Sequence, residues 1–151
     1  MNYGLSPVAF AVAFPFHIVF GADLKIVQVG HVLARLIPNL LGRKLCDSFT
    51  IQRPAIEATF EEIRLHGQSI FFVVAKDKEL RFKGQMLYVE ATDTIAFLCS
   101  PWIADITQVE PLGLELKDFA IHDPISDYLL LLQSKNSALN DTKKLAEKLS
   151  E

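Results

Sequence analysis

Cysteine is scarce in this chain of 151 residues, and so is any excess of positive charge. The two cysteines, Cys46 and Cys99, lie far apart in apolar surroundings. A secreted disulfide scaffold would need more cysteines, and a zinc site would need closely spaced Cys and His residues. We therefore expect reduced, buried thiols in a cytoplasmic protein. The net charge is −3, and Lys and Arg are scattered rather than gathered into a stripe, which excludes nucleic acid as a partner.

Sequence motifs of the common enzyme classes are also missing. Gly21 and Gly30 are too far apart for a dinucleotide-binding loop, and no G-x-S-x-G sequence occurs. The four histidines, which form no local metal motif, are His17, His31, His66 and His122. A PAS-like pocket can hold haem through one axial histidine, so any of the four could be a haem ligand. We favour the simpler interpretation that all four are ordinary surface histidines or hydrogen-bonded core histidines. The sequence predicts no catalytic, cofactor-binding or metal-ligating residue, and we do not expect an enzyme.

Two acidic clusters have simpler explanations than catalysis. Glu57, Glu61 and Glu62 share a predicted helix with Arg64, which indicates a solvated helix face. The other cluster lies on both sides of Pro124 in the sequence and comprises Asp118, His122, Asp123 and Asp127. Here Asp123 is typical of a helix N-cap, with Pro124 at the first helical position.

The longest stretch without charge runs from Leu5 to Phe20. It lacks the preceding Lys or Arg of a signal peptide, is interrupted by Pro7 and Pro15, and is shorter than the roughly 20 residues that span a bilayer. We therefore expect no membrane insertion, and we interpret residues 1–13 as an apolar arm that leads into a strand. Such an arm must cover a surface, either that of a partner subunit or its own sheet.

Half of the residues are apolar, and eleven are Phe, which is ample for one packed domain. Period-two or β-branched patterns predict strands at residues 14–20, 24–29, 70–75, 80–89 and 95–99. Helical spacing predicts helices over 32–37 and from Pro54 to Gly67, and residues 40–51 are interpreted as short helical turns. This order predicts an α+β fold with a five-stranded antiparallel sheet and helices on one face, which is the arrangement of a PAS domain.

Beyond Pro124 the pattern changes to a helix with a stripe like an imperfect coiled-coil seam. Its members are Leu132, Lys135, Leu139, Thr142, Ala146 and Leu149. We expect a linker helix over residues 124–151 that belongs to a longer protein and is cut within the pattern. The predicted divisions are thus an arm at 1–13, a PAS-like domain at 14–123 and this signalling helix.

Several strings of residues resemble a known family. They are Phe14 to Phe20, Leu24 to Gly30, Arg53-Pro54, Leu80 to Tyr88, Phe97 to Pro101, Gly113-Leu114 and Asp118 to Asp123. Together they resemble the haem-NO-binding-associated (H-NOX-associated, HNOBA) domain, a PAS-like module of soluble guanylate cyclases that also occurs in bacterial signalling proteins, including histidine kinases. The likeness extends over residues 14–132. One departure is Gly21-Ala22, where the family usually has an acidic and a basic residue in this turn.

The resemblance implies a non-catalytic module in nitric oxide signalling that does not itself bind the haem. It would pair with itself or a homologous subunit, and it would relay the state of an H-NOX haem protein or domain to an output domain, for which we favour a histidine kinase. The predicted dimer interface consists of Val8, Phe10, Val12, Phe14, Leu132, Leu139 and Leu149. The alternative is a PAS sensor that holds a small ligand or haem between its sheet and helices.

Overall fold

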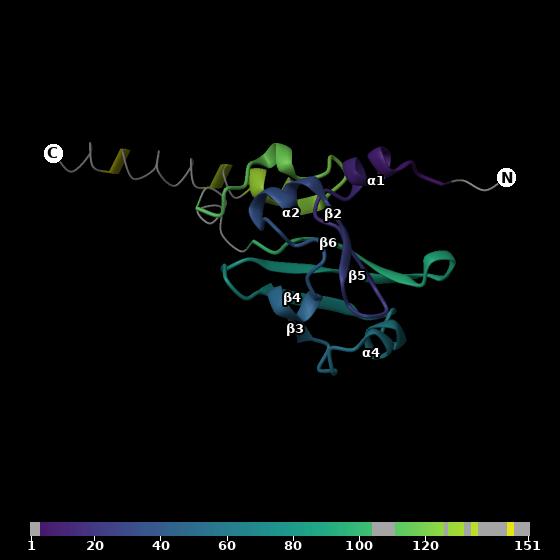
Figure 1. The fold of residues 1–151 in the computed structure, drawn as a ribbon. Helices are drawn as coiled ribbons and strands as arrows, with labels where there is room; N and C mark the ends of the chain where they lie inside the picture. The colour runs from purple at the N-terminus through teal and green to yellow at the C-terminus, as the bar shows by residue number, and fades with distance from the viewer. Residues whose placement is uncertain (1–3, 104–110, 126, 132–133, 136–144, 147–151) are drawn as a thin grey trace. The chain divides into compact units, whose positions relative to one another are not determined.

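The computed structural model describes residues 4–103, 111–125, 127–131, 134–135 and 145–146 (Figure 1). The chain forms two compact units, Met1–Trp102 and Ile103–Glu151. The first unit contains the sheet and the helices before and between its strands. The second contains a short 3-10 helix and the start of the C-terminal helix.

The first unit is built on one antiparallel sheet with the strand order β2-β1-β6-β5-β4-β3. The α+β class and the antiparallel sheet are confirmed, but the sheet has six strands, so the prediction of five was wrong. The strands are β1 (Ile18–Gly21), β2 (Ile26–Val29), β3 (Phe49–Arg53), β4 (Ile70–Ala75), β5 (Arg81–Val89) and β6 (Thr94–Pro101).

The additional strand is β3, which lies at the edge of the sheet and pairs only with β4. The sequence predicted helical turns over residues 40–51, and α3 (Leu45–Ser48) does occupy part of that range. The alternation that marks β3 is short, with Phe49 buried, Thr50 exposed and Ile51 half-buried. Three residues directly after a helix are too few to reveal a period of two, so pairing with β4 decides the strand.

Two further helices, α2 (His31–Leu36) and α4 (Phe60–Leu65), lie between strands. Helix α2 buries Val32, Leu33 and Leu36, as their spacing predicted. Helix α4 does not begin near Pro54, where we expected it. It begins at Phe60 because Thr59 caps it, and the Thr59 hydroxyl accepts a hydrogen bond of 3.2 Å from the backbone N–H of Glu62.

One face of the sheet forms the core with helix α4. Phe20 of β1 contacts Phe60 of α4 at 6.4 Å between ring centroids, and Phe60 contacts Tyr88 of β5 at 6.1 Å. The largest fully buried side chains are aromatic: Phe20, Phe71, Phe82 and Phe97 come from four strands, and Phe16 lies in the turn before β1. At Gly84 in β5, an added Cβ would lie 2.2 Å from the carbonyl oxygen of Leu98, so glycine allows β5 and β6 to pack this closely.

The apolar arm is a helix, α1 (Pro7–Ala13). The hydroxyl of Ser6 accepts a hydrogen bond of 3.1 Å from the backbone N–H of Ala9, and Pro7 occupies the first turn. The predicted strand from Phe14 was therefore partly wrong, because β1 begins only at Ile18. A segment that is apolar on all sides fits a period of two or of 3.6 equally well, and the sequence did not separate them.

In the second unit, residues 124–125 and 127–131 are helical, and so are 134–135 and 145–146. The carboxylate of Asp123 accepts a hydrogen bond of 3.0 Å from the backbone N–H of Ile125, which confirms Asp123 as the N-cap. The 3-10 helix η3 (Leu116–Asp118) precedes it and has a capping box between Glu115 and Asp118.

Three residues of the predicted interface lie outside the described residues: Leu132, Leu139 and Leu149. In the described part of the chain, no helix combines the length and apolar character needed to cross a membrane.

Candidate interaction surface

Part of the face of the sheet opposite the core is also apolar. Strand residues point alternately to the two faces, so the neighbours of the core residues in β4, β5 and β6 share this second face. Ile70 pairs with Gln85 and Leu87 pairs with Ala96 across it. The side chains of Ile70 and Leu87 are 57% and 44% exposed, and Phe72, Val74 and Leu98 on the same face are half-buried. We call this surface the open face.

Helix α1 has two sides with different roles. Val8 and Val12, four residues apart, are 76% and 65% exposed. Phe10 and Phe14 are half-buried and their ring centroids are 5.2 Å apart, and Phe10 also meets the ring of His17 edge-on at 4.7 Å. The four predicted interface residues of the arm are thus divided, because Val8 and Val12 face solvent whereas Phe10 packs within the unit.

His17 is the polar centre of this region and is fully buried. Its Nδ1 lies 2.6 Å from the carbonyl oxygen of Phe14, and its Nε2 lies 2.8 Å from the amide nitrogen of Gln28. These contacts fit a neutral ring that donates from Nδ1 and accepts at Nε2. Burial lowers the pKa of His17, the bond to Phe14 raises it, and the charge of His31 lowers it.

The position of His17 matters because the residue joins two elements. It links the end of α1, through Phe14 and Phe10, to strand β2, through Gln28. The sequence identified His17 only as an ordinary hydrogen-bonded or surface histidine, and it carried no signal for this role. To ligate a haem iron through Nε2, the ring would have to give up its bond to Gln28.

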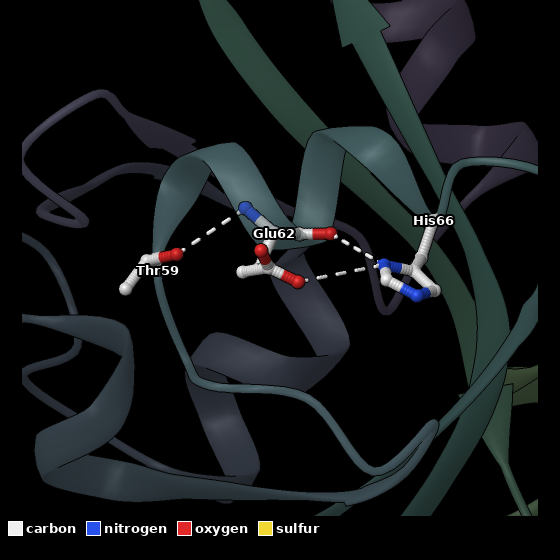
Figure 2. A network of polar contacts seen from close by, with 3 residues as sticks. All are labelled: Thr59, Glu62 and His66. Atoms are coloured by element: carbon white, nitrogen blue, oxygen red, sulfur yellow. Dashed lines mark hydrogen bonds and ion pairs between the residues drawn. The ribbon is translucent and has the colours of Figure 1, made fainter.

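The remaining histidines lie elsewhere. His31 and His122 are exposed. Figure 2 shows that His66 closes α4: its Nδ1 lies 2.8 Å from the carbonyl oxygen of Glu62 and 4.0 Å from the carboxylate of that residue. With Thr59 at the other end, this network caps a short helix.

One cavity borders helix α2. It has a volume of about 340 Å³ and is lined by Val29, Ala34, Ile37, Asn39, Leu40 and Leu41. This lining is mainly apolar, and no histidine is among its described residues. Across the residues that the structure describes, no three side chains of His, Cys, Asp or Glu gather where they could hold a metal ion.

Both cysteines are free thiols. Cys99 is buried and its Sγ lies 3.2 Å from the carbonyl oxygen of Phe16, to which it donates. Burial raises the pKa of this thiol well above its ordinary value. Cys46 is only half-buried, so the prediction of two buried thiols holds for Cys99 alone.

Comparison with known proteins relates the chain to one family. The sequence model of the family described as "Heme NO binding associated" matches residues 4–81 and 74–151. Among curated proteins, the human guanylate cyclase soluble subunit alpha-2 is 32% identical over 93% of this chain. The soluble guanylate cyclase gcy-31 of Caenorhabditis elegans is 30% identical over 83%, and the rat guanylate cyclase soluble subunit beta-2 is 29% identical over 94%. The matched region is only 20–23% of the length of these relatives.

Proposed function

The chain belongs to the heme NO binding associated family, and from this premise we propose that it is a non-catalytic dimerisation and relay module. It pairs with a second copy or a homologous subunit, and it passes the state of an H-NOX haem sensor to an output domain. Its fold is PAS-like in this proposal. The strand order β2-β1-β6-β5-β4, with helices between β2 and β4, supports that assignment, and β3 is an addition at the edge.

The relatives bear on the output domain. The human, rat and Caenorhabditis elegans relatives are named guanylate cyclases, and the chain spans about a fifth of their length. They therefore favour a cyclase as the output of the parent protein. They give no support to the histidine kinase that the sequence suggested, which stays a prediction.

The exposed side of α1 is the observation that carries the dimerisation proposal. Val8 and Val12 face solvent on a helix of seven residues that buries no residue fully. A helix this short is marginal on its own, so the contacts of Phe10 and Phe14 with the His17 region stabilise it. These contacts hold the two valines in a fixed position. Burying each valine against a partner would stabilise a dimer by about 1.5 kcal/mol.

Relay requires a connection between this module and the output domain, and the C-terminal helix provides it in this proposal. Asp123 caps the start of this helix, and residues 124–125, 127–131, 134–135 and 145–146 are helical. A change of rotation or register in this helix would reach the output domain. The seam residues Leu132, Leu139 and Leu149 stay part of the proposed interface.

Sedimentation velocity at several protein concentrations tests the proposal. We compare the wild-type chain with the double variant Val8→Asp/Val12→Asp, and the control is Leu65→Asp on α4, whose side chain is 77% exposed. Loss of about 3 kcal/mol from two valines predicts a dimer weakened at least about 100-fold. Phe10→Asp is a poorer test because Phe10 packs on His17 within its own unit.

The outcomes separate the hypotheses. A wild-type dimer that dissociates in the double variant, but not in the control, supports the α1 interface. A dimer of unchanged strength in the double variant rejects that interface. Recording the same runs at haem wavelengths addresses the alternative, because coloured protein would favour a haem-binding PAS sensor.

A further inference from the structure

A second cavity opens on the first unit, toward the edge of the sheet that carries β3. Its volume is about 380 Å³, and it is lined by Gln52, Arg53, Phe72, Val73, Arg81 and Trp102. Two of these residues are arginines, two are aromatic and none is acidic. This size lies within the range of ligand-binding pockets, which is roughly 300–1,000 Å³.

The register of the strands brings a third cation beside the cavity. Arg53 of β3 pairs with Phe72 of β4, and Phe72 pairs with Lys83 of β5. Directly paired residues point to the same face, so these three form one row across the sheet. Arg81 lies two residues before Lys83 and shares that face. We call Arg53, Arg81, Lys83, Phe72 and Trp102 the cationic patch.

The patch is held in place by its own contacts. The Nζ of Lys83 lies 4.9 Å from the ring centroid of Trp102 and 5.9 Å from that of Phe72, both within the range of a cation–π interaction. The backbone N–H of Trp102 donates a hydrogen bond of 2.7 Å to the carbonyl oxygen of Arg81. The ammonium group of Lys83 is therefore positioned against both rings, and the backbone at Trp102 is joined to the backbone at Arg81.

Within residues 4–103, no carboxylate forms an ion pair with the cations of the patch. Among the described residues, no ion pair includes Arg53, Arg81 or Lys83. Asp77 and Glu79 in the adjacent hairpin loop are close in sequence to Arg81, but no ion pair joins either of them to it within this described part of the chain. Since the whole chain has a net charge of −3, this local excess of positive charge is a departure from the rest of the molecule.

We propose that the cationic patch binds an acidic peptide segment of a partner protein. Guanidinium groups match carboxylates in a bidentate geometry, and the rings of Phe72 and Trp102 offer a surface for an apolar side chain between the acidic ones. The cations extend from β3 to β5, a span of roughly 10 Å at the usual strand spacing. An extended segment reaches across this distance, whereas a compact free anion does not.

The net charge of the chain disfavours a nucleic acid as the occupant, because a long polyanion would also meet the negative remainder of the surface. The site is separate from the exposed side of α1. The proposal therefore does not depend on dimerisation through Val8 and Val12, and each can fail without the other.

Fluorescence titration of the 151-residue chain tests the site directly, because Trp102 is its only tryptophan. The probe is an acetylated and amidated peptide of sequence Glu-Glu-Leu-Glu-Glu. Matched peptides replace every Glu by Gln or by Lys, and glutarate and inorganic phosphate represent free anions. We expect a saturable change with the Glu peptide that weakens as salt is added, and no such change with the Gln or Lys peptides.

Variants connect the signal to the patch. Arg53→Gln and Arg81→Gln should each weaken binding about threefold to fivefold, as expected for partly exposed ion pairs. Lys25→Gln removes an exposed charge elsewhere and should leave the affinity unchanged. Thermal unfolding of each variant shows whether it is folded. Equal affinity for the Gln peptide, unchanged binding in both arginine variants, or glutarate or phosphate bound as tightly as the peptide would each overturn the proposal.

Discussion

Mild acidification is expected to loosen the attachment of α1, because His17 is held neutral. The ring donates from Nδ1 to Phe14 and accepts at Nε2 from Gln28, at 2.6 and 2.8 Å. Protonation places a hydrogen on Nε2, opposite the amide hydrogens of Gln28, and that bond is lost. A hydrogen bond of this kind contributes about 1 kcal/mol, and a buried charge costs more.

The direction of the pH dependence follows from the lowered pKa of His17. The unfolded chain takes up the proton near the ordinary value of 6.5, whereas the folded chain takes it up only at lower pH. Between these two values the unfolded state binds more protons, so the free energy of unfolding falls as the pH falls. For one proton the slope is at most about 1.4 kcal/mol per pH unit, and above the unfolded pKa the contribution is fully present.

Urea unfolding at a series of pH values, followed by the fluorescence of Trp102, measures this slope for the first unit. The variant His17→Asn keeps an amide donor near the position of Nδ1 but cannot titrate. Its unfolding free energy should be lower than that of the wild type at neutral pH and should vary less below pH 6.5. The control His31→Asn should keep most of the wild-type slope, since the charge of His31 is a minor cause of the shift. If the unfolding free energy varied with pH equally in wild type and His17→Asn, the proposed role of neutral His17 in holding α1 would be refuted.

Two further expectations follow from the packing of the sheet. Gly84→Ala should lower the free energy of unfolding by about 3 kcal/mol in urea titrations, because the new Cβ would lie 2.2 Å from the carbonyl oxygen of Leu98. In the matched control Gly4→Ala, the new Cβ meets no atom within 4 Å, so the free energy of unfolding should change little. Similar losses in both variants would contradict this reasoning. In the folded protein, iodoacetamide should modify the half-buried Cys46 much faster than the buried Cys99, because the raised pKa of Cys99 keeps its thiol protonated. Peptide mass mapping before and after unfolding measures the two rates. Equal rates before unfolding would contradict the burial of Cys99.

The sequence was most informative where the pattern is local. Residues 70–75 were predicted as a strand and form β4 with these bounds, because a run of β-branched and aromatic residues has few alternatives. The N-cap at Asp123 and the buried side of α2 were likewise predicted from neighbours within one or two turns. The family strings were also contiguous, which is why the family could be identified from the sequence.

The interface residues show where local patterns fail. Val8, Phe10, Val12 and Phe14 alternate, and in a strand they would share one face. In a helix each residue turns by about 100°, so residues two apart lie on nearly opposite sides. The helix therefore leaves Val8 and Val12 in solvent and turns Phe10 toward His17.

The sequence by itself determined the composition of the core, most of the elements and the family. Only the tertiary structure decided which residues meet. Arg53, Arg81 and Trp102 are separated by more than twenty residues from one another along the chain, and the register of β3, β4 and β5 places them around one cavity. His17 and Gln28 meet because β1 and β2 pair. Strand pairing depends on hydrogen bonds between distant segments, and no local pattern encodes the partner of a strand.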